Sequence, residues 1–161
     1  THTGRWATLK TCMEERLFQW DEGCPETNVI ALVPEQDLNK LIRDSDGEFE
    51  GDRLRTLADR LGTAEKNIET LIETCGEQGM SLRDVVLAAA IGDTTNAPEG
   101  KVKQWKKHGA KWFKSERGGR ELAEKALDLG LWPQLRGQLL PFLNALRTAI
   151  GLDTVTDLAD E

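Results

Sequence analysis

Histidine and cysteine, the residues that most often bind metals or act as nucleophiles, are few and widely spaced in this chain. Neither His2 nor His108 lies at metal-ligand spacing from a cysteine or from the other histidine, so the pattern indicates no zinc site. Cys12, Cys24 and Cys75 form no CxxC motif and are too few for a disulfide framework. They favour a reducing compartment, and we expect a cytoplasmic protein.

Two glycine-containing segments have a superficial likeness to ligand-binding loops. Residues 92–101 end in Gly-Lys as a phosphate-binding loop does, but the spacing is too long and Val102 stands where a magnesium-binding hydroxyl is needed. In the acidic run 44–50, aligning Gly47 with the turn glycine of a calcium loop puts Arg53 at the bidentate acid position. We therefore expect no cofactor, no metal and no catalysis. An enzyme whose few acids meet only in the fold is the remaining alternative.

Basic residues are concentrated in one segment of an otherwise acidic chain. Residues 101–120 carry a net charge of +7 while the whole chain carries −7, so the remaining residues carry −14. The eight basic side chains are Lys101, Lys103, Lys106, Lys107, Lys111, Lys114, Arg117 and Arg120. Such an asymmetry can steer an anionic partner to one face. The alternative is that these side chains bind the protein's own acidic residues, or those of a second copy.

The segment 56–72 resembles the helix-turn-helix motif of DNA-binding proteins. The resemblance rests on a small residue, a glycine four positions later and apolar residues around both: Ala58, Gly62, Leu57, Leu61, Ile68 and Leu71. A tight turn requires the glycine, and the close crossing of two helices requires the small side chain. The resemblance implies that the second helix enters the major groove through its first residues, 63–67.

The charge of that second helix opposes such a role. Residues 64–77 contain four glutamates and one lysine, Lys66, a net charge of −3 that DNA phosphates would repel. Two helices packed in the core, with no contact to DNA, are therefore the alternative interpretation.

Helical spacing of apolar residues and helix-capping residues recur along the chain. They predict helices over about 6–20, 34–42, 52–61, 63–76, 82–91, 102–114, 120–129 and 135–150. Residues 29–33 are the one β-like run and have no partner strand, so we expect an extended segment or the entry to the next helix. Pro141 is expected to kink or split the last helix.

On a helix over 102–114, the aromatic and basic side chains separate onto two faces. Val102, Trp105, Trp112 and Phe113 fall in one stripe, which predicts that the tryptophans pack in the core. Lys103, Lys107, Lys111 and Lys114 fall on the opposite side. Gly109 is the position at which this helix is most easily broken.

The resulting prediction is an all-α protein, either one irregular helical bundle or two small helical halves. Residues 1–91 form an acidic N-terminal half, the turn-forming run 92–100 a linker, and residues 101–161 a C-terminal half with the basic segment. The apolar runs are too short to span a membrane, and we expect no signal peptide.

We expect a non-enzymatic module that binds the phosphate backbone of nucleic acid through the eight basic residues of 101–120, as an accessory domain of a replication, transfer or regulatory protein. The alternative is a protein–protein adaptor without nucleic-acid contact, for which the apolar segment 139–146 is suited. The oligomeric state is left open.

Overall fold

The computed structural model describes residues 20–44 and 47–157, and all regular structure in these residues is helical. The elements are α2 (Pro25–Leu32), the short 3-10 helix η1 (Glu35–Asp37), α3 (Leu38–Ile42), α4 (Glu50–Leu61), α5 (Ile68–Glu77), α6 (Leu82–Ile91), α7 (Val102–Gly109), α8 (Glu116–Asp128) and α9 (Trp132–Ala149). The all-α prediction is confirmed. The helix expected over residues 6–20 lies almost wholly outside the described residues.

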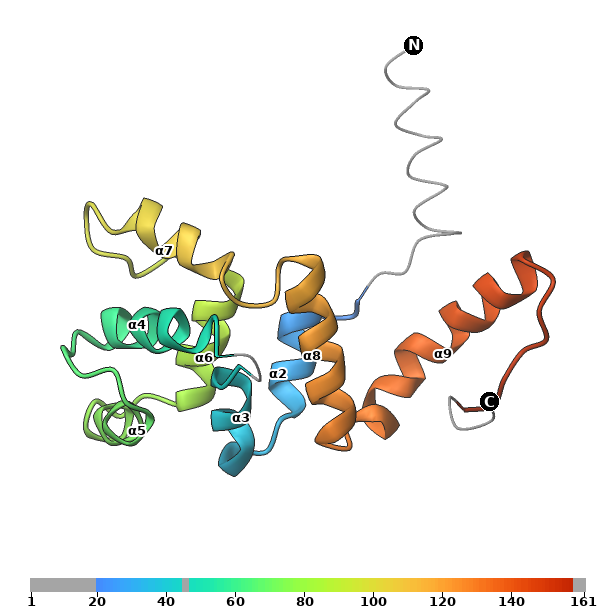
Figure 1. Cartoon of the computed structure of the whole chain (residues 1–161), viewed down its shortest axis with the longest axis horizontal. Helices are drawn as coiled ribbons and strands as arrows, with labels where there is room; N and C mark the ends of the chain where they lie inside the picture. Colours follow the sequence, from blue (N-terminus) through green and yellow to red (C-terminus); the bar gives the residue numbers. More distant parts are fainter. Residues whose placement is uncertain (1–19, 45–46, 158–161) are drawn as a thin grey trace, which may run out of the picture.

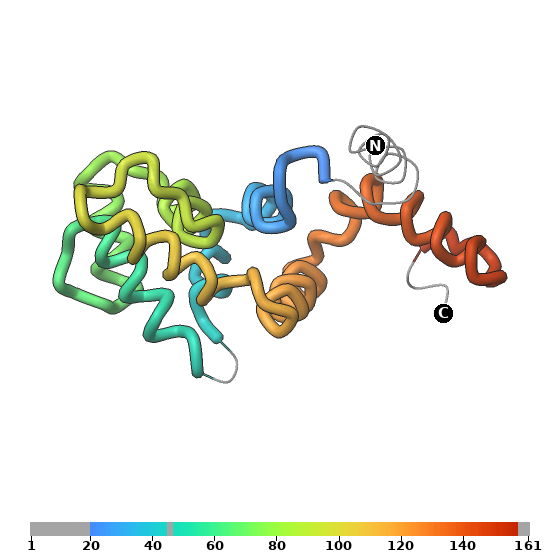
Figure 2. Tube along the Cα trace, turned by 90° about the horizontal axis from the view of Figure 1, so that it is seen from above, coloured from blue at the N-terminus to red at the C-terminus, as the bar shows by residue number. Residues whose placement is uncertain are grey.

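The helices are arranged along one long axis. Helices α4, α5, α6 and α7 gather at one end, α2 and α8 lie beside each other in the middle, and α9 runs outward at the other end (Figure 1). The view from above shows the same order (Figure 2). The apolar core runs through the first two of these regions, and Leu135 is the single fully buried residue that α9 contributes to it.

Local sequence signals set several helix boundaries as expected. The Ser81 side chain caps α6 by accepting a hydrogen bond from the backbone N–H of Asp84, and the left-handed Gly62 ends α4. Leu38, Leu41 and Ile42 all face the core, as their spacing predicts. These boundaries follow from residues that lie within one helical turn of them.

Residues 29–33 are not an extended segment, because α2 begins at Pro25 and continues to Leu32. Proline is favoured in the first helical turn, where its missing N–H costs nothing. Val29 and Ile30 are buried on this helix, which explains their β-like appearance in sequence. The extended backbone of Val33 is typical of a residue that precedes a proline, and Pro34 follows it.

Two other helix boundaries differ from those expected from the sequence, one at a capping residue and one at a glycine. Helix α5 begins at Ile68 and not at 63 or 64, because the Asn67 side chain accepts a hydrogen bond from the Thr70 N–H and caps it there. Helix α7 ends at Gly109 and not at residue 114. Pro141 does not split α9, which is one helix from Trp132 to Ala149.

The segment 92–100 is non-helical, and one core joins the residues on its two sides. Val29 and Leu57 from before it, and Phe113 and Leu122 from after it, belong to the same buried cluster. Helix α8 contacts α2 and α3, while α7 contacts α4 and α6. The regions before and after 92–100 therefore pack against each other over several helices.

Two glycines allow backbone segments to touch where a side chain would not fit. A Cβ atom on Gly109 would lie 2.7 Å from the Cα of Gly92, which explains why α7 meets the end of α6 at this point. A Cβ atom on Gly118 would lie 2.5 Å from the carbonyl oxygen of Trp112. Both contacts are with backbone atoms, so a larger residue would require a helix to move.

Gly118→Ala is therefore expected to destabilise the protein by about 1–3 kcal/mol, the usual cost of overpacking a filled site. Its neighbour Gly119 is the matched control, because the nearest atom to an added Cβ is 3.8 Å away. Gly119→Ala should be neutral or slightly stabilising, since alanine favours the helical state. Urea unfolding followed by circular dichroism measures both changes. Equal stabilities of the two variants would contradict the close contact at Gly118.

Candidate functional site

Trp105 fixes the orientation of α7 against α4. Its ring is buried, and its indole Nε1 donates a hydrogen bond of 2.7 Å to the carboxylate of Asp59. The guanidinium group of Arg60 lies 4.3 Å from the centre of the same ring. The prediction that Trp105 is a core residue is confirmed, but Val102 is 46% exposed and does not share its buried stripe.

Trp112 and Phe113 reach the core from the turn that follows Gly109, not from the helix expected over 102–114. Trp112 is 1% exposed and Phe113 is 4% exposed. The predicted burial of Trp112 is therefore confirmed, while the predicted reason for it was wrong. Because the helix ends at Gly109, the lysine row expected along it is also interrupted.

Three of the eight basic residues form neither an ion pair nor a side-chain hydrogen bond within the described part of the chain. These are Lys103, Lys106 and Lys107, all of which are exposed on α7. Lys106 and Lys107 follow Lys103 by three and four residues, so all three lie on one side of the helix. We call these three the α7 lysines.

Acidic side chains from α4 and the preceding loop pair with three of the other basic residues. Lys101 forms an ion pair of 2.5 Å with Asp59, and Lys111 approaches Asp52 at 3.7 Å. Arg117 pairs with Glu48 and lies 3.7 Å from Asp44. The neutralisation by the chain's own acidic residues, one of the alternatives drawn from the sequence, thus occurs for part of the basic segment.

The last two basic residues bond to nearby groups of the protein. Lys114 donates a hydrogen bond to the carbonyl oxygen of Ile91, and Arg120 lies 3.8 Å from Glu116 on its own helix. Five of the eight basic residues therefore bond to groups of the protein itself. The α7 lysines are the three for which the described residues supply no such partner.

The Asp59 carboxylate beneath α7 is held in its charged form. Burial alone would raise its pKa, but hydrogen bonds from Lys101 and Trp105 and the positive charge of Lys101 outweigh that and lower it. Burial lowers the pKa of His108, which lies nearby on α7. A neutral His108 adds no positive charge to the α7 surface near pH 7.

A buried ion pair that the sequence analysis did not find joins α4 to α8. The Arg53 side chain is fully buried, and its two terminal nitrogens donate hydrogen bonds of 2.7 and 2.6 Å to the carboxylate of Glu121. It also donates to the carbonyl oxygens of Leu41 and Arg43. Arg53 and Glu121 lie 68 positions apart, so no sequence spacing indicates the pair.

Aromatic rings enclose this ion pair. The Arg53 guanidinium carbon lies 5.5 Å from the ring centre of Trp112 and 4.9 Å from that of Phe113. Lys125 lies 3.4 Å from Glu121 and also donates hydrogen bonds to backbone carbonyl groups near the end of α3. The arrangement is structural, because its polar groups are directed at each other and not at an open cavity.

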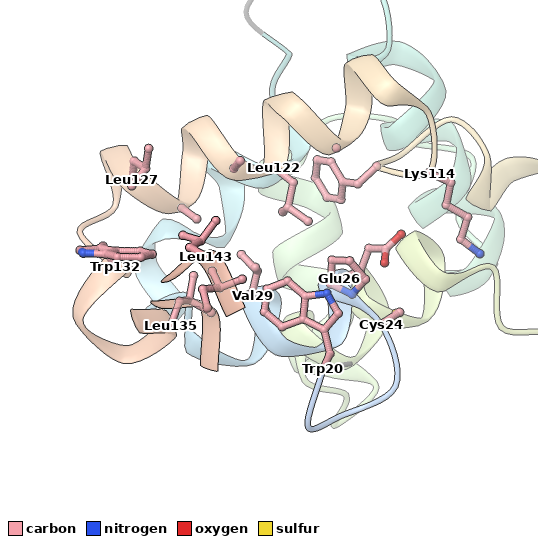
Figure 3. Close-up of a pocket in the computed structure, with 16 residues that line it drawn as sticks. Trp20, Cys24, Glu26, Val29, Lys114, Leu122, Leu127, Trp132, Leu135 and Leu143 are labelled. Carbon is pink, nitrogen blue, oxygen red and sulfur yellow. The ribbon is translucent and has the colours of Figure 1, made fainter. Parts of the chain in front are cut away.

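An apolar groove lies between α2, α8 and α9. Its volume is about 740 Å³, and Figure 3 shows side chains that line it. They include Trp20, Cys24, Glu26, Leu122, Trp132 and Leu143. Leu139 and Leu143, from the apolar segment that favoured an adaptor, both line it, while Leu146 is 44% exposed. We call this hollow the apolar groove.

The helix-turn-helix resemblance stays a prediction. Its two helices are α4 and α5, which contact each other, and Leu57, Ala58, Leu61 and Leu71 are buried. Residues 63–67, which the resemblance would place in the major groove, lie before α5 and not on it, and Asn67 is the helix cap. The residues that such a helix would present first are therefore Ile68, Glu69 and Thr70.

Nothing in the described ranges groups histidine, cysteine and carboxylate side chains closely enough to hold a metal ion. No helix of residues 20–44 and 47–157 combines the length and apolarity needed to cross a membrane. Comparisons of the chain with protein-family models, with curated proteins and with solved structures find no match. The α7 lysines and the apolar groove are therefore the two candidate functional surfaces.

Proposed function

We propose that this protein is a non-enzymatic helical binding module that contacts the phosphate backbone of nucleic acid through the α7 lysines. The observation that carries the proposal is that Lys103, Lys106 and Lys107 are exposed on one helix without an ion-pair partner in the described residues. Lysine is a point charge that suits phosphate oxygens and carries no base information by itself. Binding is therefore expected to be independent of sequence.

The rest of α7 supports this role by holding the lysines in place. Trp105 and Gly109 bury the opposite side of the helix against α4 and the end of α6. The surface is small, so the affinity is expected to be weak and strongly dependent on salt. The module would act as an accessory domain within a cytoplasmic replication, transfer or regulatory protein, where another domain supplies sequence recognition.

Fluorescence anisotropy with labelled single- and double-stranded oligonucleotides, over about 20–200 mM salt, tests this proposal. Three phosphate contacts predict a slope of roughly −3 in a plot of log affinity against log salt for duplex DNA. Replacing all three α7 lysines with glutamine should abolish most of that slope and leave the thermal midpoint nearly unchanged, because these side chains are solvated.

A matched control removes three positive charges elsewhere. Lys40→Gln, Arg43→Gln and Lys66→Gln together lower the net charge equally and lie on exposed positions around α3 and α5. If the control loses as much affinity as the α7 variant, the attraction belongs to the net charge and not to α7. An absence of binding at the lowest salt would overturn the proposal.

The apolar groove favours a second function, the docking of another protein. Monomeric soluble proteins rarely leave a large apolar hollow uncovered, and such hollows commonly mark interaction sites. This adaptor function does not require nucleic acid. It would become the leading proposal if oligonucleotides fail to bind.

A further inference from the structure

Helix α9 carries one apolar stripe that begins in the apolar groove and continues onto an exposed surface. Residues three or four positions apart share a face of a helix, and on α9 and its C-cap they are Trp132, Leu135, Leu139, Leu143, Leu146 and Ile150. The first four line the groove, whereas Leu146 is 44% exposed and Ile150 is 72% exposed. The groove and the exposed helix end are therefore parts of one continuous apolar face.

The chain cannot bring that exposed end into its own groove. Because α9 is a single helix, Ile150 lies about 22 Å beyond Leu135 at a rise of about 1.5 Å per residue. The segment that follows is tied to the same helix, since Asn144 exchanges two hydrogen bonds with the backbone of Val155. Both views show α9 pointing away from the end formed by α4–α7 (Figures 1 and 2). Leu146 and Ile150 are thus placed to enter a groove on another molecule.

A second copy of the chain provides a matching surface. If two α9 helices pair antiparallel around a two-fold axis that crosses just after Phe142, Leu146 of each copy lies opposite Leu139 of the other. The same axis places Ile150 opposite Leu135. Each copy then contributes one groove and one exposed helix end, which is the self-complementary arrangement that a two-fold interface requires. Apolar residues at three- and four-residue spacing suit such a helix pair.

The charges beside the groove also favour a second α9 as its occupant. Helix α9 contains Arg136 and Arg147 and no acidic residue. Residues 20–32, which form the α2 side of the groove, contain no basic residue and three acidic ones: Asp21, Glu22 and Glu26. A second α9 would therefore bring positive charge next to an acidic rim. Such complementarity favours encounter in the correct orientation and adds less to the affinity.

We propose that the protein forms a two-fold dimer through α9, with the exposed end of each helix lying across the apolar groove of the other copy. The interface contains one helix and one groove from each copy, so we expect a weak dimer with a dissociation constant of about 10 μM. The proposal assigns the groove to a second copy and not to a different protein. It does not depend on nucleic-acid binding, because α7 lies at the other end of the molecule (Figure 1).

Sedimentation velocity of the full chain over about 1–200 μM tests the proposal, because association follows mass action. The unaltered protein should change from monomer to dimer across this range. Leu146→Glu with Ile150→Glu should keep the protein monomeric throughout, since dimerisation would bury two charges. Both side chains are exposed in a single copy, so the circular dichroism spectrum and the Tm of this variant should be nearly unchanged.

The matched control is Ala145→Glu with Thr148→Glu, which adds the same charge to exposed positions of α9 away from the stripe. It should dimerise as the unaltered protein does. The proposal fails if the unaltered protein stays monomeric at the highest concentration. It also fails if the control loses dimerisation equally, since the effect then follows charge and not face. Replacing the three α7 lysines with glutamine should leave the dimer intact, which separates this result from a failure of nucleic-acid binding.

Cys24 reports whether the groove is covered, because its thiol lines the groove and is partly exposed. A water-soluble maleimide, followed by peptide mass spectrometry, should modify Cys24 roughly ten-fold more slowly in the dimer than in the diluted monomer. Slow modification at every concentration, and in the Leu146→Glu, Ile150→Glu variant, would show that the same chain covers the groove and would overturn the proposal. Fast modification within a dimer would place the interface elsewhere and overturn it as well.

Disulfide formation tests the antiparallel direction of the two helices. Leu139→Cys protein is mixed with Leu146→Cys protein at a concentration that favours the dimer, with an isotope label on one of them, and then oxidised. Antiparallel helices should give the mixed disulfide between positions 139 and 146 in several-fold excess over links between like positions, because a disulfide requires close Cβ atoms. An excess of links between two copies of position 146 would indicate parallel helices and overturn the proposed arrangement.

Discussion

Replacing Glu121 with alanine is expected to destabilise the protein by about 3–5 kcal/mol, the usual cost of removing one partner of a buried ion pair. The Glu121 carboxylate accepts a hydrogen bond from each terminal nitrogen of the fully buried Arg53. No other carboxylate of the described residues forms an ion pair with that guanidinium group. Its loss leaves the buried guanidinium group next to Trp112 and Phe113 with hydrogen bonds to two backbone carbonyl groups but without the carboxylate that neutralises it. Chemical unfolding followed by circular dichroism measures the change. A loss of this size can exceed the whole free energy of unfolding, so a variant that is already unfolded at 25 °C would agree with the prediction.

Glu124 provides the matched control for this experiment. It lies on the same helix, is exposed, and Glu124→Ala should change stability by no more than about 0.5 kcal/mol. The double variant Arg53→Met with Glu121→Leu removes both charges and should recover most of the lost stability, since apolar residues can replace a buried ion pair. If Glu121→Ala is no more harmful than Glu124→Ala, the ion pair does not stabilise the fold.

The second large effect is expected at Trp112, where truncation to alanine should cost about 3–5 kcal/mol. The ring is 1% exposed and packs against both Phe113 and the Arg53 guanidinium group. Its indole Nε1, however, has no hydrogen-bond partner among the described residues. Trp112→Phe therefore removes an unpaired buried donor and should cost much less than truncation.

Trp105 gives the contrasting case, because its Nε1 bonds to Asp59. Trp105→Phe should lose about 1.5–3 kcal/mol, the contribution of a hydrogen bond to a charged group, in addition to the change in packing. If Trp112→Phe proves as harmful as Trp105→Phe, the two indole groups do not differ as the structure shows. Binding of oligonucleotides should be unchanged in all three variants, since neither ring is available for base stacking.

The sequence predicts the parts of this fold that are determined within one or two helical turns. The α6 boundaries follow from Ser81 and Gly92, and the inward face of α3 follows from the spacing of its apolar residues. The end of α7 was harder to predict, because glycine is tolerated in helices. The helix ends at Gly109 where the backbone of Gly92 lies against it, a contact between residues 17 positions apart that no local pattern contains.

The sequence shows that the candidate site is rich in basic residues, but it does not show how those residues are arranged or what they contact. The eight basic residues are visible as a cluster in the sequence, but their partners are not. Asp59 and Asp52 lie on α4 and reach Lys101 and Lys111 only because α7 packs across that helix. Glu26 likewise has no unusual sequence context, and its position in an apolar groove depends on α8 and α9.

The Arg53–Glu121 pair also constrains the order in which the protein can fold during its synthesis. When residues up to 100 have been made, the helix that carries Arg53 is complete, but the carboxylate and the aromatic rings that enclose its guanidinium group do not yet exist. The nascent chain must keep Arg53 hydrated until α8 leaves the ribosome, so α4 cannot reach its final packing earlier. Cutting the chain within 92–100 should accordingly yield no stable N-terminal fragment.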